Sequence, residues 1–152
     1  MLPSVFGAVY APRGVASTYV GGGAEAVLLA WSDNAPAFGP SQGRVRFDIG
    51  LFDSVGGEPS FGKMVQYRLG TQVSFERNAS RSYMIPVFAF DLGGLYTSST
   101  RTQWFADAGV GLYLIQLRSV IVDLEATYVI PFKDPDVLAG VRTRLGVSVA
   151  LW

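Results

Sequence analysis

The sequence contains no cysteine and no histidine among its 152 residues. Without cysteine the chain has no disulfide, no thiolate metal site and no cysteine nucleophile. Without histidine it lacks the side chain that most often acts as general base in enzymes. We therefore expect a protein that is not an enzyme and that binds no cofactor and no metal.

Net charge and lysine are also scarce. Twelve basic and twelve acidic residues cancel to a formal charge of zero, which leaves no electrostatic footprint for nucleic acid. Only Lys63 and Lys133 are lysine, so ten of the twelve basic residues are arginine. Arginine favours fixed, bidentate ion pairs over solvated surface charge. The composition excludes a nucleic-acid partner and predicts paired charges.

Long hydrophobic runs are missing although the chain is apolar. It is 49% hydrophobic and 16% charged, with a mean hydropathy of +0.30, whereas a soluble domain has about 25% charged residues. No run of 18 apolar residues occurs, so a transmembrane helix is excluded. Only a closed β-barrel could then span a bilayer. The length fits a single domain covering residues 1–152.

Strict alternation of apolar and polar residues predicts the strands. In segment 43–52, Val45, Phe47 and Ile49 share one face, and Arg44 and Arg46 share the other. The same period of two extends over 65–76, 120–130 and 137–151. Four weaker strands are predicted at 4–11, 20–32, 83–96 and 103–117, where glycine and alanine dilute the pattern.

The predicted connections are short and rich in turn-forming residues. They cover 12–17, 33–42, 55–60, 77–82, 97–102, 118–119 and 131–136. Connections of this length force neighbouring strands to pair antiparallel. The predicted fold is therefore all-β, an eight-stranded antiparallel up-and-down transmembrane barrel.

Two segments are ambiguous within this scheme. Residues 24–31 could form two helical turns by propensity alone, but they lie among strands and we predict a strand. Pro86 falls inside a predicted strand and removes a ladder donor, so we expect a bulge there or a strand that begins after it.

The polar faces carry arginine and carboxylates in near balance. Buried charges must be paired or hydrated, and an eight-stranded barrel is just wide enough for side chains to fill it. We therefore predict apolar residues outward and a charge network inside, mainly as a structural plug, with a narrow water or ion path as the second reading. The predicted network consists of Glu25, Arg44, Arg46, Asp48, Arg68, Glu76, Asp91, Asp107, Asp123, Glu125, Arg142 and Arg144.

Strand length and aromatic placement favour lipid on the outside. The clearest strands run to roughly 10 to 15 residues, against the 9 to 11 that cross a bilayer. Aromatic residues gather near strand ends, as interfacial girdles require. The predicted girdle residues are Tyr10, Tyr19, Phe61, Phe75, Tyr83, Tyr96, Trp104, Tyr128, Phe132 and Trp152.

The whole chain resembles the small outer-membrane barrels of the OmpA and OmpX kind. The resemblance is architectural: it rests on eight alternating segments, the short turn at Arg118 and Ser119, and a last strand that ends in Trp152. It departs from that pattern at Trp152, which by alternation falls on the polar face of the strand with Arg142 and Ser148 and not on the apolar face. The resemblance implies both termini in the periplasm, and a lipid bilayer and the outer-membrane assembly machinery as partners, with other envelope proteins as a further possibility. It implies location in the bacterial outer membrane; since no export signal precedes the first strand, we expect the signal to have been removed.

Four short motifs have simpler explanations than chemistry. Residues 39–43 match the G-x-S-x-G elbow of hydrolases, but the base is missing. Residues 21–26 match a loose dinucleotide fingerprint without a βαβ unit. Asn78 begins a glycosylation sequon on a predicted turn, and Asp134 and Asp136 are too few for a calcium site.

Two other classes of protein share the same periodicity. A soluble ligand-binding barrel of the lipocalin or avidin kind would place the apolar face inside. A non-membrane assembly protein would pack that face against other subunits. The orientation of the apolar side chains, inward or outward, distinguishes the first alternative from the membrane barrel. Oligomerisation in buffer without detergent distinguishes the second.

Overall fold

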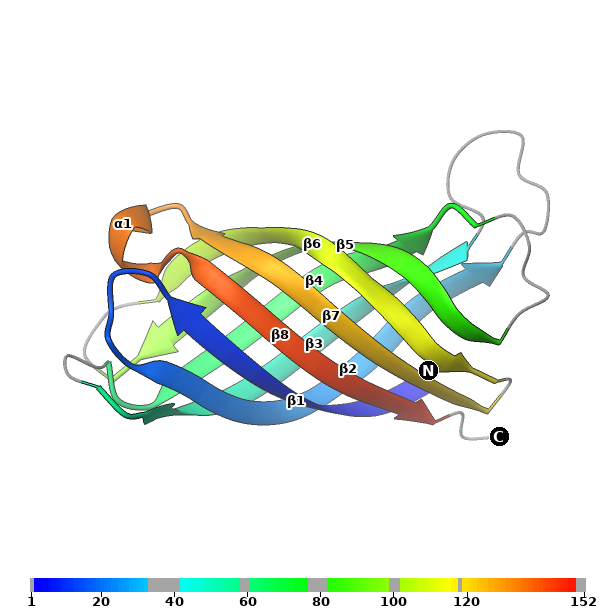
Figure 1. The fold of residues 1–152 in the computed structure, drawn as a ribbon, viewed down its shortest axis with the longest axis horizontal. Coiled ribbons are helices and arrows are strands. Elements are labelled where there is room, and N and C mark those ends of the chain that lie inside the picture. The colour runs from blue at the N-terminus through cyan, green and yellow to red at the C-terminus, as the bar shows by residue number, and fades with distance from the viewer. Residues whose placement is uncertain are drawn as a thin grey trace.

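The computed structural model describes residues 2–32, 42–57, 61–76, 82–98, 102–117 and 119–149. Within these ranges the chain forms an elongated barrel of tilted strands (Figure 1). The strands are β1 (Leu2–Pro12), β2 (Thr18–Ser32), β3 (Gln42–Val55), β4 (Met64–Ser74), β5 (Tyr83–Thr97), β6 (Gln103–Gln116), β7 (Val120–Pro131) and β8 (Gly140–Val149). One short helix, α1 (Pro135–Leu138), precedes β8.

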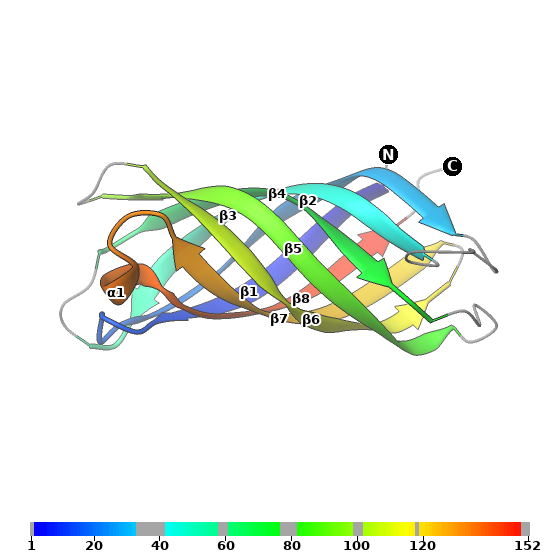
Figure 2. The same cartoon turned by 90° about the horizontal axis from the view of Figure 1, so that it is seen from above.

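Each strand pairs antiparallel with its neighbour in sequence, and β1 also pairs with β8. The sheet therefore closes on itself with no free edge, and the predicted up-and-down barrel is confirmed. The first and last strands run side by side, with Ser4 opposite Ser148 and Pro12 opposite Gly140. Both termini lie at one end of the barrel and α1 lies at the other (Figures 1 and 2). We call these the termini end and the α1 end.

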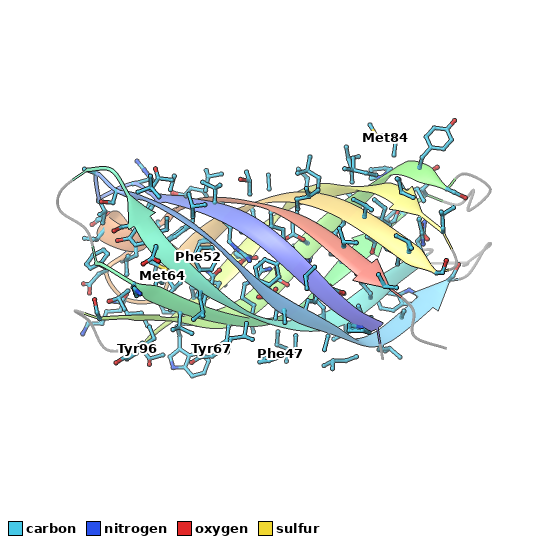
Figure 3. The ribbon with its side chains drawn as sticks, turned by 90° about the horizontal axis from the view of Figure 1, so that it is seen from below. Phe47, Phe52, Met64, Tyr67, Met84 and Tyr96 are labelled. Carbon is cyan, nitrogen blue, oxygen red and sulfur yellow. The ribbon has the colours of Figure 1, made fainter. Side chains whose placement is uncertain are left out.

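The side chains face as the alternation predicts. On β4, Arg68 is 1% exposed and the neighbouring Leu69 is 52% exposed. Every strand carries at least one large apolar side chain on the outside, as Figure 3 shows for Phe47, Tyr67 and Tyr96. Representatives in strand order are Val5, Val20, Ile49, Leu69, Leu92, Val110, Leu124 and Leu145. The outer wall is therefore apolar around the whole circumference.

The two ambiguous segments are both part of strands. Residues 24–31 lie within β2, so strand pairing overrides their helical propensity. Strand β5 begins at Tyr83 and runs through Pro86, which lies opposite Leu112. The expectation of a strand that begins after Pro86 is wrong. The irregularity lies two residues earlier, where Met84 has a φ of 54°.

The prediction that the last strand begins at residue 137 is also wrong. Pro135 stands in the first turn of α1, where its missing N–H costs nothing, and Asp134 before it has a φ of 53°. Val137 and Leu138 belong to this helix, and β8 starts at Gly140. The alternation of small and apolar residues at 137–141 imitates a strand. Backbone bonds from Arg13 and Gly14 to the carbonyls of Ala139 and Val137 tie α1 to the β1–β2 turn.

The predicted turn at 118–119 is a connection of three residues, 117–119. The Leu117 N–H donates to the Val120 carbonyl oxygen at 2.8 Å, while Arg118 itself lies outside the described residues. Such a short link keeps β6 and β7 adjacent, as the sequence predicts.

Glycine in β2 allows close approach of the β3 backbone. A Cβ on Gly23 would overlap the carbonyl oxygen of Ile49 on β3. On β1, a Cβ on Gly7 would meet nothing closer than the Gly21 oxygen at 3.9 Å.

We therefore predict that Gly23→Ala lowers the free energy of unfolding by about 1 to 3 kcal/mol, because the strands must move apart. Gly7→Ala is the matched control and should leave it unchanged. The midpoint of urea unfolding, followed by circular dichroism, measures both. Equal midpoints for the two variants would contradict the tight contact between β2 and β3.

Candidate functional site

The candidate site is the charge network in the middle of the lumen. Strands β2 to β8 each supply at least one inward-facing charged side chain, and each of these is 3% exposed or less. The structure thus buries eleven of the twelve predicted residues in the lumen, namely Glu25, Arg44, Arg46, Asp48, Arg68, Asp91, Asp107, Asp123, Glu125, Arg142 and Arg144.

Glu76 is the exception. The polar face of β4 ends at Ser74, two residues before it, and Glu76 is half-buried beyond the strand end. Its backbone N–H donates to the Ser74 hydroxyl at 3.3 Å. The structure therefore places Glu76 beyond the end of β4, because the strand is shorter than the alternation suggests, and its membership of the interior network stays a prediction.

Arg68 donates hydrogen bonds to three carboxylates. Its Nε lies 3.1 Å from both oxygens of Asp48, and its Nη2 donates to Oδ2 of the same residue at 2.5 Å. Its Nη1 donates to Asp91 at 3.0 Å and to Asp107 at 3.3 Å. Asp48 lies directly opposite Arg68 on β3, and Asp91 lies opposite Asp107 across β5 and β6. Strand register therefore creates this cluster.

Arg46 and Arg144 join further carboxylates to the network. Arg46 Nη2 donates to Glu125 at 2.6 Å and to Asp91 at 3.0 Å. Arg144 Nη1 donates to Glu25 at 2.6 Å. Asp91 contacts both Arg46 and Arg68, so the ion pairs of these two arginines form one connected system.

Neutral side chains complete the network, and the charge-based prediction missed them. Arg44 donates to Gln72 at 2.7 Å, to Ser148 at 3.0 Å and to Asp123 at 2.7 Å. The Gln72 amide in turn donates to Glu125 at 2.5 Å. Gln72 and Ser148 share the parity of the charged residues on their strands. The alternation along each strand could therefore have identified both residues as inward-facing.

Apolar clusters lie in the lumen on both sides of the network. At the α1 end, nine buried residues pack together: Phe6, Ala8, Tyr10, Tyr19, Phe52, Met64, Leu95, Phe105 and Val129. At the termini end, Ile85, Val87 and Tyr113 form a smaller cluster with Ile121 against it. We call these the α1-end cluster and the termini-end cluster.

Two predicted girdle residues belong instead to the α1-end cluster. Tyr10 and Tyr19 are fully buried and point into the lumen. The Tyr10 hydroxyl donates to the carbonyl of Leu138 in α1, and the Phe61 N–H donates to the Tyr19 hydroxyl at 2.6 Å. These bonds fasten two connections over the end of the barrel. The girdle assignment is wrong for both tyrosines because it considered their position along the strand and ignored their inward parity.

The other described aromatic residues of the predicted girdles divide by position. Phe75, Tyr83, Tyr96, Trp104, Tyr128 and Phe132 are exposed on the outer wall or just beyond it. Phe61 packs against the α1-end cluster, and Trp152 lies outside the described residues. Tyr67 and Trp104 meet edge to face at the α1 end, with ring centroids 5.8 Å apart.

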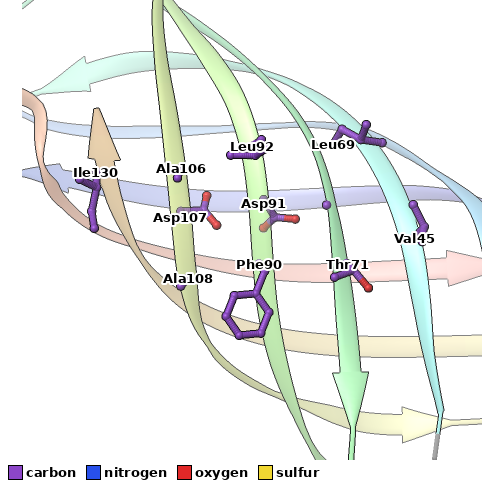
Figure 4. A pocket seen from close by; sticks show the side chains of 11 residues that line it. Val45, Leu69, Thr71, Phe90, Asp91, Leu92, Ala106, Asp107, Ala108 and Ile130 are labelled. Atoms are coloured by element: carbon purple, nitrogen blue, oxygen red, sulfur yellow. The ribbon is translucent and has the colours of Figure 1, made fainter. Parts of the chain in front are cut away.

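A shallow apolar groove of about 530 Å³ crosses the outer wall (Figure 4). Small residues of β6 form its floor, between larger side chains of β4, β5 and β7. Its principal lining residues are Leu69, Phe90, Leu92, Ala106, Ala108 and Ile130. The groove follows from the alternation of large and small residues on the outer face.

The short sequence motifs do not form a binding or catalytic site in the part of the chain that the structure describes. Residues 21–26 lie on β2 and form no phosphate-binding turn. The hydrolase-like motif at 39–43 and the sequon at 78–80 lie wholly or largely outside the described residues. Within the described ranges, no three His, Cys, Asp or Glu side chains are grouped so that they could hold a metal ion. In the same ranges no helix is long and apolar enough to cross a membrane.

No protein-family profile matches this chain. No curated protein sequence matches it either. Among solved structures it is similar to the solution NMR structure of the de novo designed TMB2.3, at 14% sequence identity and a TM-score of 0.49. The similarity covers 99% of this chain and 94% of the designed chain.

The ion network predicts a sharp response to loss of Arg68. Arg68→Met removes the cation that hydrogen-bonds to Asp48 and Asp107 and one of the two that contact Asp91. Removing one partner of a buried ion pair costs about 3 to 5 kcal/mol. We expect a matching fall in the free energy of unfolding, measured by urea titration. Adding Asp48→Asn to this variant should recover part of the loss. A double variant less stable than Arg68→Met would contradict the pairing.

Proposed function

We propose that this chain is an integral β-barrel of the bacterial outer membrane with a structural role. The observation that carries the proposal is the inverted distribution of side chains. Arginine and carboxylates are buried in the lumen, and large apolar side chains are exposed on all eight strands. A soluble monomer rarely exposes more than a few hundred Å² of continuous apolar surface. An apolar outer surface of this extent is suited to contact with the hydrocarbon core of a bilayer.

Strand length supports the same environment. The strands have 10 to 15 residues, and 9 to 11 tilted residues cross a bilayer. Closure of the ladder between β1 and β8 pairs the backbone groups that lipid cannot hydrogen-bond. Some exposed aromatic residues lie towards the two ends of the wall, with Trp104 and Phe132 at one end and Phe75 and Tyr83 at the other, while Phe47 and Phe90 lie at mid-strand. The end positions suit the two interfaces of a bilayer.

The lumen supports a structural role in preference to a pore. Charged side chains fill its middle, and the α1-end cluster, with members on β1 to β7, closes it on one side. Neither an open water column nor a catalytic centre is needed to explain these residues. In this proposal the partners are the lipid bilayer and the outer-membrane assembly machinery, with other envelope proteins as further candidates.

A soluble ligand-binding barrel does not agree with this orientation of the side chains. Its ligand would occupy an apolar interior, whereas Ile49, Leu69 and Leu92 point outward and Arg46 and Arg68 point inward. An assembly protein that covers the same wall with other subunits fits equally well. Its expected behaviour is folding in detergent-free buffer as an oligomer.

Folding in phospholipid vesicles tests the proposal. We expect a heat-modifiable, folded band with vesicles and aggregation in buffer alone. Leu69→Arg should lower the stability in the bilayer by about 2 to 4 kcal/mol, because it places a charge on the lipid face near mid-strand. Val137→Arg is the matched control, since Val137 is exposed on α1 at the end of the barrel. A soluble folded oligomer, or equal stability of the two variants, would refute a lipid-facing wall.

Planar-bilayer recording tests the closed lumen separately. The inserted wild-type barrel should give no stepwise current above the bare membrane, because the α1-end cluster blocks the path. Phe105→Ala, which truncates a fully buried member of that cluster, should raise the frequency of current steps. Regular single-channel openings of the wild-type barrel would favour the narrow-pore reading.

A further inference from the structure

Arg142 differs from the other lumen arginines. Arg44, Arg46, Arg68 and Arg144 each lie within 4.0 Å of a carboxylate. Arg142 is 1% exposed, and among the described residues no acceptor lies within hydrogen-bonding distance of its three guanidinium nitrogens. Its nearest described ring contact is Phe6, at 5.6 Å from the ring centroid. A buried guanidinium without acceptors is costly, so a binding partner is expected.

Two neutral residues share this lack of protein partners. Thr127 lies directly opposite Arg142 on β7, and its hydroxyl has no hydrogen-bond partner among the described residues. Gln66 on β4 is 1% exposed, and neither atom of its amide is bonded within the same set. Both residues are inward-facing and buried. Three polar side chains from three strands thus have unused hydrogen-bonding capacity.

These residues hold equivalent positions along their strands. On its own strand, each lies one inward-facing position beyond a network residue towards the α1 end: Gln66 beyond Arg68, Thr127 beyond Glu125, and Arg142 beyond Arg144. The next inward positions on β4 and β7 are Met64 and Val129, which belong to the α1-end cluster. We call Gln66, Thr127 and Arg142 the polar layer. It lies between the ion network and the apolar closure.

Charge balance decides what the polar layer binds. Among the described residues the lumen holds five guanidinium groups and six carboxyl groups, so no added anion is needed to balance the guanidinium charge. Arg142 therefore lacks hydrogen-bond acceptors among the described residues, but an added anion is not needed to balance the charge of the lumen. Water supplies acceptors to Arg142 and both donors and acceptors to Gln66 and Thr127, which an anion cannot do.

We propose that Gln66, Thr127 and Arg142 bind a cluster of ordered water molecules inside the lumen. A buried water typically makes about three hydrogen bonds, and this layer provides polar groups from three strands. Asp107 Oδ1, a further buried acceptor without a partner among the described residues, offers the cluster a contact with the ion network. The waters are enclosed by the α1-end cluster on one side and the network on the other. The assignment concerns the interior and does not depend on what surrounds the barrel.

Paired substitutions test the water cluster in whichever medium the chain folds. Arg142→Met removes a guanidinium that only water contacts, and its urea midpoint should equal or exceed that of the wild type. Arg68→Met, the matched control, should lower the midpoint clearly. Exchanging chloride for fluoride or bromide should leave the wild-type midpoint unchanged. A loss in Arg142→Met as large as that in Arg68→Met would overturn the proposal in favour of a direct ion pair. An anion-dependent midpoint that disappears in Arg142→Met would overturn it in favour of an anion site.

A measurement on the wild-type chain covers the case in which Arg142→Met does not fold. Water-to-protein NMR cross-relaxation should show contacts from long-lived water to the Arg142 guanidinium and to the Gln66 amide. The Arg68 guanidinium is the internal control, because carboxylates occupy its donors. Absence of water contacts at both Arg142 and Gln66 would refute the cluster.

Discussion

Closure of the hydrogen-bond ladder between β1 and β8 is the constraint on which the other features depend. Because the two strands pair from Ser4 opposite Ser148 to Pro12 opposite Gly140, the sheet has an inside and an outside, and each residue of a strand faces one or the other. A shift of one residue in this register would exchange the two faces. The apolar wall and the charged lumen are thus two consequences of one pairing.

The lumen is organised in layers along the barrel axis. The termini-end cluster, the ion network, the polar layer and the α1-end cluster follow one another. Buried ion pairs are costly to desolvate, and they persist where several partners satisfy each charge. Three carboxylates satisfy the charge of Arg68 directly. Water molecules would satisfy the hydrogen-bond donors of Arg142. The α1-end cluster excludes bulk solvent from that end of the lumen.

Alternation predicted which residues face inward, because a period of two needs no knowledge of the partner strand. It could not predict that Arg68 contacts Asp48, since that pairing depends on the register of β3 and β4. It failed at Tyr10 and Tyr19 because strand-end position was given more weight than parity. It failed at Val137 because Pro135 and Asp134 start a helical turn inside an apparently alternating segment. It extended β4 as far as Glu76, although the strand ends at Ser74, because alternation does not reveal where a strand ends.

The central claim, a wall that faces hydrocarbon, can be measured directly because the chain contains no cysteine. A nitroxide attached at Ile49→Cys, at mid-strand on the outer face, can be compared with one attached at Lys63→Cys near the α1 end. In vesicles, the label at position 49 should be relaxed strongly by oxygen and weakly by a water-soluble nickel complex, and the label at position 63 should show the reverse. Strong relaxation of the position-49 label by the nickel complex would contradict the account.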